Sequence, residues 1–220
     1  MTQESSEIPG SDGEHDLQGR HGTEKRACAF YDKQMLSYLN PTMCEFISRM
    51  EMVFIATSDS NGECDCSFRA GLPGFLHVID QKTLLYPEYR GNGVMASLGN
   101  ISENAYIGLF FADFFDSTLG LHVNGMARIV DSSELAEQFD LTPELQRDLR
   151  VEDGRKPEHW VVVEVEEAYI HCAKHIPHLK KLDKTIHWGT DVEAHKGGDG
   201  FNVGVSAGDP NPGVGSGSTN

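Results

Sequence analysis

Short strand patterns joined by tight turns are the feature that most constrains the fold of this 220-residue chain. The dipeptide Asn61-Gly62 is a strong hairpin signal, and polar and apolar residues alternate along residues 63–69. A second hairpin is expected to turn at Asp80-Gln81. Parallel strands need long crossover connections, and these turns are too short for one. The pattern therefore predicts an antiparallel sheet.

The rest of the central sequence predicts one mainly β domain with short helices. A capping box, Thr42-Met43-Cys44-Glu45, indicates the start of a helix, and a further short helix is expected over about 93–102. One or two short helices are expected within 131–150, with Asp131 and Thr142-Pro143 as starts. Gly125 interrupts a long strand pattern and predicts a β-bulge. Strands are expected at residues 52–57, 63–69, 75–79, 83–86, 105–111, 119–130 and 160–172.

Both ends of the chain differ in composition from this domain. Residues 1–27 are acidic and lack hydrophobic periodicity, so we expect a disordered segment. The domain is predicted to cover residues 28–190, followed by a glycine-rich flexible tail over 191–220. Trp188 and Phe201 are unusual residues for a free linker and predict that this end of the chain docks locally.

Charge and cysteine content exclude some partners. The formal net charge of −16 argues against nucleic acid and anionic membranes, which both require basic surfaces. The polar, acidic N-terminus shows no signal peptide, and five cysteines suggest reduced thiols, so a cytoplasmic protein is expected. Cys64 and Cys66 share one face of a predicted strand and are expected to point into the core.

The loop after residue 86 resembles a phosphate-binding loop. Gly91-x-Gly93-x-x-Ala96 fits a dinucleotide fingerprint, with Asp113 about 20 residues later. An antiparallel sheet argues against a Rossmann domain. A helix that starts near Gly93 would still offer free N–H groups to an anion, and Arg90 would add a guanidinium. The alternative is an ordinary tight turn with Arg90 in solvent, and the loop alone does not decide between them.

Four segments together resemble a known family. They are FIATSDSNGECDCSFRAGLPGF, TLLYPEYRGNGVMASLGNISENAYIGLFF, LHVNGMARIV and VEEAYIHCAKHIP, in this order. In this arrangement, over roughly residues 30–190, the chain resembles the pyridoxamine 5'-phosphate oxidase-like proteins, which are FMN-binding split β-barrels. The resemblance implies an antiparallel Greek-key split β-barrel that forms a homodimer and binds FMN in a groove at the dimer interface.

The resemblance also implies which residues bind the cofactor. Ser67 and Arg69 correspond to the strand that reaches the flavin and its phosphate. Tyr86 and Pro87 correspond to the strand end beside the ring and ribityl chain. The phosphate end is then expected at Tyr89, Arg90, Asn92 and Gly93, with Ser97 one helical turn further on. In the oxidase, basic residues near the C-terminus are expected to bind pyridoxamine phosphate. They are not recognisable in this sequence, which argues against a vitamin B6 enzyme.

The functional expectation is an FMN-dependent oxidoreductase that acts on a small molecule. No catalytic residue can be named, which fits flavin chemistry, because the cofactor carries the reaction. The alternatives are a flavin carrier or sensor without turnover, and a haem-binding split barrel that uses one of His171, His175 and His178. No zinc site is expected, because no cysteine-pair or acidic motif completes those histidines. Another alternative is that His171 and His175 line the cofactor groove near the dimer interface. A homodimer is expected from an aromatic surface formed by Leu109, Phe110, Phe111, Phe114 and Phe115.

Overall fold

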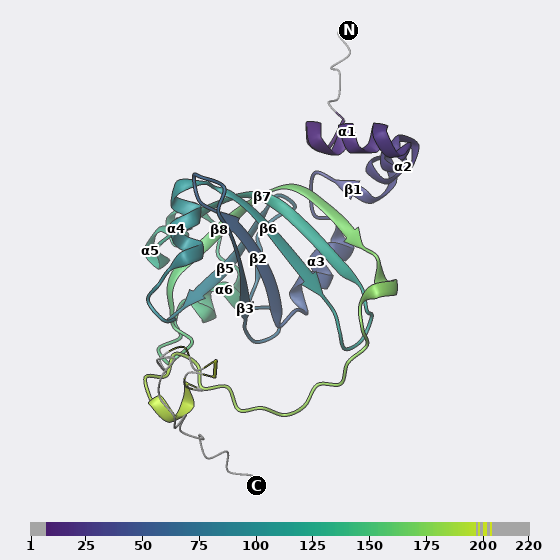
Figure 1. Ribbon diagram of the computed structural model, residues 1–220. Helices are drawn as coiled ribbons and strands as arrows, with labels where there is room; N and C mark the ends of the chain where they lie inside the picture. Colours follow the sequence, from purple (N-terminus) through teal and green to yellow (C-terminus); the bar gives the residue numbers. More distant parts are fainter. Residues whose placement is uncertain (1–7, 197, 199, 202, 204–220) are drawn as a thin grey trace.

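A single antiparallel sheet dominates the structure, a computed structural model that describes residues 8–196, 198, 200, 201 and 203. The sheet has eight strands in the order β3-β2-β6-β7-β8-β5-β4, and β1 pairs with β8 (Figure 1). The strands are β1 (Met35–Leu36), β2 (Met52–Ser58), β3 (Cys64–Ala70), β4 (His77–Val78), β5 (Thr83–Tyr89), β6 (Tyr106–Ala112), β7 (Gly120–Val130) and β8 (Pro157–His171). The predicted mainly β, antiparallel split-barrel fold is therefore confirmed.

The helices are short and lie around the sheet (Figure 1). They are α1 (Asp12–His21), α2 (Glu24–Gln34), α3 (Pro41–Ser48), α4 (Ala96–Glu103), α5 (Ser132–Gln138) and α6 (Pro143–Asp148). Helix α3 begins at Pro41 with Asn40 as its cap, because the Asn40 side chain accepts a hydrogen bond from the Met43 amide at 2.9 Å. The expected capping box at Thr42 is therefore wrong by two residues, whereas Asp131 and Thr142 cap α5 and α6 as predicted.

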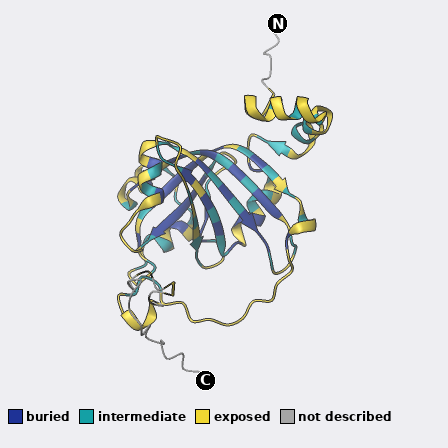
Figure 2. Ribbon diagram, in the orientation of Figure 1, coloured by how far each residue is buried: buried dark blue, intermediate teal, exposed yellow. Residues whose placement is uncertain are grey.

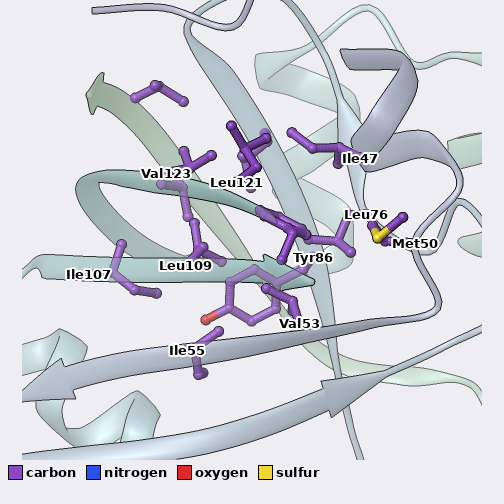
Figure 3. Packing of buried hydrophobic residues seen from close by; sticks show 14 of the residues in the cluster. Ile47, Met50, Val53, Ile55, Leu76, Tyr86, Ile107, Leu109, Leu121 and Val123 are labelled. Carbon is purple, nitrogen blue, oxygen red and sulfur yellow. The ribbon is translucent and has the colours of Figure 1, made fainter. Parts of the chain in front are cut away.

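The barrel interior is built by alternation along the strands. Inward-facing residues of β2, β6 and β7 are buried while their neighbours are partly exposed, so the buried positions alternate along the strands (Figure 2). Figure 3 shows this packing, with Tyr86 of β5 among aliphatic side chains such as Ile55 and Val53. A second cluster, which includes Leu85 and Trp160, fills the space between the sheet and α5 and α6. Strand β5 is therefore buried on both faces.

Glycine at position 125 permits a bulge between β7 and β8. The pairing register shifts between Asn124 and Gly125, as the sequence predicts. A Cβ atom at Gly125 would lie 1.9 Å from the backbone oxygen of Glu164, so no other residue fits without movement of the backbone.

The face of β3 that carries Cys64, Cys66 and Phe68 points outward, contrary to the prediction. Both cysteines are exposed, and half of the Phe68 surface is exposed. The prediction failed because an apolar face normally marks the core, whereas here Phe68 packs against Phe54 on the outside of the sheet, at a ring-centroid distance of 5.5 Å.

Helices occupy part of the N-terminal segment that was expected to be disordered. Ser11 and Glu14 form a complete capping box at the start of α1, and Gly22 ends the helix in the left-handed conformation. Neither α1 nor α2 has a buried residue, but Phe30 of α2 packs edge-to-face on Tyr169 of β8. Local capping therefore accounts for α1, whereas α2 begins at Glu24 without a side-chain cap. Residues 1–7 lie outside the described residues.

Candidate cofactor-binding groove

A groove of about 800 Å³ lies where β3, the end of β5 and the start of α4 meet. Seven of the nine predicted cofactor-binding residues line it: Ser67, Arg69, Tyr89, Arg90, Asn92, Gly93 and Ser97. They come from separate parts of the chain, and the sheet brings them together. Whether they bind FMN stays a prediction.

The other two predicted residues do not line this groove. Tyr86 is fully buried inside the barrel, and its hydroxyl has no hydrogen-bond partner among the described residues. Burial raises the pKa of Tyr86, and the nearby Glu88 carboxylate adds to the effect. Pro87 faces a separate cavity of about 270 Å³ that is also lined by Trp160. The predicted contacts of Tyr86 and Pro87 with a flavin ring therefore have no support in this geometry, since β5 turns both side chains elsewhere.

The loop that was compared with a dinucleotide fingerprint is an Asx turn. Strand β5 continues to Tyr89, so Arg90 directly follows the strand. The Asn92 side chain accepts a hydrogen bond from the Val94 amide at 3.0 Å, and Gly93 has a φ of 81°. Met95 is left-handed and precedes α4, which starts at residue 96 rather than near Gly93 as predicted. The first turn of α4, the end of the helix whose N–H groups lack intrahelical partners, still lines the groove.

Arg69 forms the inner end of the groove. Its Nε donates to both carboxylate oxygens of Glu88, at 2.8 and 3.0 Å, and its Nη1 donates to the Ser67 hydroxyl at 2.7 Å. The pair joins β3 to β5, which lie far apart in the order of the sheet strands. Burial raises the pKa of the Glu88 carboxyl, and Arg69 only partly offsets this rise. Glu88 was not predicted, because Pro87 made this part of the chain look like a loop.

Arg90 forms the outer end of the groove. Its Nη1 lies 2.9 Å from the Asp191 carboxylate, which belongs to the C-terminal segment. Trp188 of the same segment packs edge-to-face on Tyr89, at a centroid distance of 5.6 Å. The expected docking of this end of the chain is thus confirmed for Trp188, whereas Phe201 is 94% exposed.

Carboxylates contact three of the predicted cofactor-binding residues: Arg69, Arg90 and Ser97. Ser97 donates its hydroxyl to Asp65 at 3.1 Å, in addition to the two arginine pairs. Asp65, Glu88 and Glu158 line the groove together with Arg69 and Arg90. The positive charge that a phosphate would need is therefore already balanced by the chain itself.

Asp113, which the fingerprint would place on a ribose, has a structural role outside the groove. The residue is buried, and its side chain accepts hydrogen bonds from the amides of Phe115, Asp116 and Ser117. Burial tends to raise the pKa of this carboxyl, but these bonds and the Ser117 hydroxyl outweigh it and lower the pKa to about 2. The turn after β6 depends on this side chain.

An aromatic ladder crosses the outer face of the sheet. We use this name for five residues that pair directly across neighbouring strands: Phe68, Phe54, Phe110, His122 and Tyr169. Ring centroids of successive members lie 4.8–6.4 Å apart. The ladder corrects the predicted aromatic surface, because Leu109 and Phe111 are buried inside the barrel and only Phe110 of β6 belongs to the ladder.

The C-terminal histidines are spread apart rather than placed on one helix. His171 ends β8, and its Nδ1 lies 3.1 Å from Nε2 of His122. Burial lowers the pKa of His122, and His171 lowers it further. His175 is exposed in a 3₁₀ turn, and Nε2 of His178 lies 3.0 Å from the Phe115 carbonyl oxygen. Neither His171 nor His175 lines the groove, contrary to the alternative that placed them there.

The described residues contain neither a metal-ligand cluster nor a membrane-spanning helix. Between residues 8 and 196 no group of three or more His, Cys, Asp or Glu side chains is placed to hold a metal ion. Each helix in the described part of the chain is too short or too polar to cross a membrane.

The family is defined by the sequence model that matches the chain. Residues 39–172 match the model of the pyridoxamine 5'-phosphate oxidase family. This match covers more than half of the chain, and the chain therefore belongs to that family. No match was found among curated proteins.

Several solved structures are similar to the chain. A putative pyridoxamine 5'-phosphate oxidase from Lactobacillus delbrueckii is 19% identical, with a TM-score of 0.44. The match covers 62% of this chain and 98% of that chain. HutZ, the haem storage protein from Vibrio cholerae, is 14% identical, with a TM-score of 0.38, and the match covers 60% of this chain and 94% of that chain. The FAD-binding protein from Mycobacterium smegmatis is 20% identical, with a TM-score of 0.36, and the match covers 62% of this chain and 100% of that chain. The family assignment rests on the sequence model.

Proposed function

We propose that the chain is an FMN-binding oxidoreductase of the cytoplasm that acts on a small molecule. The observation that carries this proposal is the convergence of two guanidinium groups and a helix N-terminus on one groove. Each favours an anion, and a phosphate monoester is an anion that can meet all of them. Five free thiols suit a reducing compartment.

The residues of the groove fit a flavin nucleotide. Its volume of about 800 Å³ is within the range of cofactor sites. Arg90 and the first turn of α4 would hold the phosphate, while Arg69 would contribute its remaining nitrogen, Nη2, from the inner end. A bound flavin supplies hydride and electron transfer, and the protein binds and orients it. A bound phosphate would displace Asp191 from Arg90, whereas Glu88 would stay paired with Arg69.

The phosphate contact is tested by comparing FMN with riboflavin, which lacks the phosphate. A charge-assisted hydrogen bond contributes about 1.5–3 kcal/mol, so Arg90→Ala should weaken FMN binding about 10- to 100-fold. Arg90→Lys should recover only part of the loss, because a point charge cannot make two parallel bonds. Riboflavin binding should stay unchanged, and Arg128→Ala serves as an exposed arginine control outside the groove. Equal effects on both ligands, or no effect on either, would exclude this loop as the phosphate site.

Turnover separates an oxidoreductase from a flavin carrier or sensor. The absorbance spectrum of the purified protein identifies a bound flavin. NAD(P)H oxidation with added quinone or nitro acceptors then measures activity. A flavin-loaded protein that oxidises NAD(P)H with none of these acceptors would favour the carrier or sensor.

The proposal includes a homodimer formed through the aromatic ladder. Its rings lie on the outer face of the sheet, and Phe68 is half exposed in the single chain. Such an apolar patch is typical of an interface. Phe68→Glu should convert a sedimenting dimer into a monomer, whereas Leu72→Glu, at an equally exposed position away from the ladder, should not. A wild-type monomer at micromolar concentration would contradict the proposal.

A haem site at His122 and His171 is the second candidate function. The observation that favours it is the pair of ring nitrogens 3.1 Å apart beside Phe110 and Tyr169, an aromatic environment suited to a porphyrin. Haem titration should then give a Soret band that His171→Ala abolishes. A spectrum unchanged by His171→Ala would exclude this site.

A further inference from the structure

The chain after β8 runs back across the molecule and reaches the groove (Figure 1). It leaves the 3₁₀ turn at Ala173–His175, and the Leu179 amide donates to the Phe114 carbonyl at 2.7 Å. Lys181 pairs with Glu51 further along. The segment then reaches the opposite side of the barrel, where Trp188 and Gly189 line the groove. We call residues 188–191 the C-terminal latch.

Three different kinds of contact hold the latch. Trp188 packs on Tyr89, and Asp191 pairs with Arg90. The third contact is a close approach of two backbones, since a Cβ atom at Gly154 would lie 1.8 Å from the Trp188 carbonyl oxygen. Gly189 has a φ of 57°, and a Cβ there would lie 2.5 Å from the Gly154 oxygen. Only glycine fits both positions in this arrangement.

We propose that the latch is an intramolecular competitor of phosphate at Arg90, so that its docking regulates how tightly the groove binds a phosphate-bearing ligand. This inference rests on the proposed function, because it concerns the same groove. The Asp191 carboxylate and a phosphate oxygen are acceptors for the same planar guanidinium fork. A phosphate that binds end-on to Arg90, through Nη1 and Nη2, displaces Asp191 from Nη1. In the proposal, Trp188 at the groove wall moves with it.

The latch is weak enough to be displaced. Arg90 and Asp191 are 57% and 66% exposed, and ion pairs as exposed as this contribute little. A stronger ligand or a higher salt concentration therefore releases the segment without unfolding the barrel.

Two variants release the latch by different means. Asp191→Asn removes the competing charge, and Gly154→Ala removes the close backbone approach. Both should tighten FMN binding about three- to fivefold, the size expected for an exposed ion pair, and leave riboflavin unchanged. Asp183→Asn is the matched charge control on the same segment. Gly99→Ala is the matched glycine control, because a Cβ there meets nothing within 4 Å.

Fluorescence quenching by acrylamide reports the latch without a flavin. The chain has two tryptophans, and Trp160 is fully buried, so accessible quenching reports Trp188. Accessibility should rise in both variants and in neither control. In the wild type, inorganic phosphate should raise it more than chloride at the same ionic strength.

The outcomes separate the latch from the proposed function. If FMN fails to bind but phosphate still raises Trp188 accessibility above the chloride control, the flavin proposal fails and the latch stands. Phosphate that acts only as chloride does would overturn the latch. Weaker or unchanged FMN binding in both variants, with Trp188 released, would also overturn it and make Trp188 part of the ligand site instead.

Discussion

The two ends of the groove use the same residue type in different ways. Arg69 is 19% exposed and its partner Glu88 is 11% exposed, whereas Arg90 and Asp191 are 57% and 66% exposed. Arg69 belongs to the fold, because its pair connects two strands that are not neighbours in the sheet. Arg90 is held only by a segment that approaches from outside. The depth of an arginine in the groove therefore separates a structural ion pair from an exchangeable one.

The largest expected effect is at the inner end. Arg69→Ala leaves the Glu88 carboxylate buried without its partner, and the free energy of unfolding should fall by about 2–3 kcal/mol. Urea unfolding followed by fluorescence measures it. The paired variant Arg69→Met with Glu88→Leu should recover most of the loss, since it removes both charges. A single variant as stable as the wild type would show that the pair contributes nothing to the fold.

A pH dependence of intermediate size should come from Glu88. Burial raises the folded-state pKa of its carboxyl above 4.5. The folded protein then binds the proton more tightly than the unfolded chain does, so the contribution of Glu88 to stability is full below about 4.5 and falls as the pH rises through the folded pKa. The stability of the wild type relative to Glu88→Gln should therefore decrease with rising pH in urea series. The opposite slope would mean that Arg69, not burial, dominates.

A smaller effect, an increase in stability, is expected for Tyr86→Phe on β5, the strand that carries Glu88. The buried hydroxyl has no hydrogen-bond partner among the described residues, and its removal should raise the unfolding free energy by about 1 kcal/mol or leave it unchanged. Thermal unfolding of the two proteins provides the comparison. A clear loss of stability would point to a water or ligand that satisfies the hydroxyl.

The smallest effect on stability is expected at the outer end. Arg90→Ala should change the unfolding free energy by less than about 0.5 kcal/mol, because an exposed ion pair is screened by water and salt. The same urea experiment measures it beside Arg69→Ala. A loss as large as that of Arg69→Ala would remove the distinction between the two ends.

The sequence predicted the sheet better than it predicted the groove. Alternation and turn signals are local, and they correctly located most strands, the Gly125 bulge and the caps at Asp131 and Thr142. The same alternation failed for β3, because its one neighbouring strand, β2, carries apolar residues on both faces. Alternation alone does not show which face of a strand points into the barrel. Phe68 shows this most directly.

The partners of the two arginines could not be read from local patterns. Glu88 lies in β5, but Pro87 led to the prediction that the strand ends before it. Strand β4 pairs with Leu84 and Leu85, so at Pro87 the strand has a neighbour on one side only, where proline is tolerated. Extending the strand to Tyr89 would have placed Glu88 on the same face as Tyr86. Asp191 gave no such signal, because its contact depends on the path of the whole C-terminal segment.

Strand β8 also has a consequence for the time at which the barrel can form. It pairs with β7 along most of its length, with β5 at its start and with β1 at its end, where Met35 meets Tyr169. During synthesis, β1 and the inner edge of β5 therefore remain without partners until the ribosome has released residue 171. Contacts between such distant residues also slow folding in the free chain. Nascent chains that stop before Pro157 should thus expose strand edges to chaperones, whereas chains that extend past His171 should close the barrel.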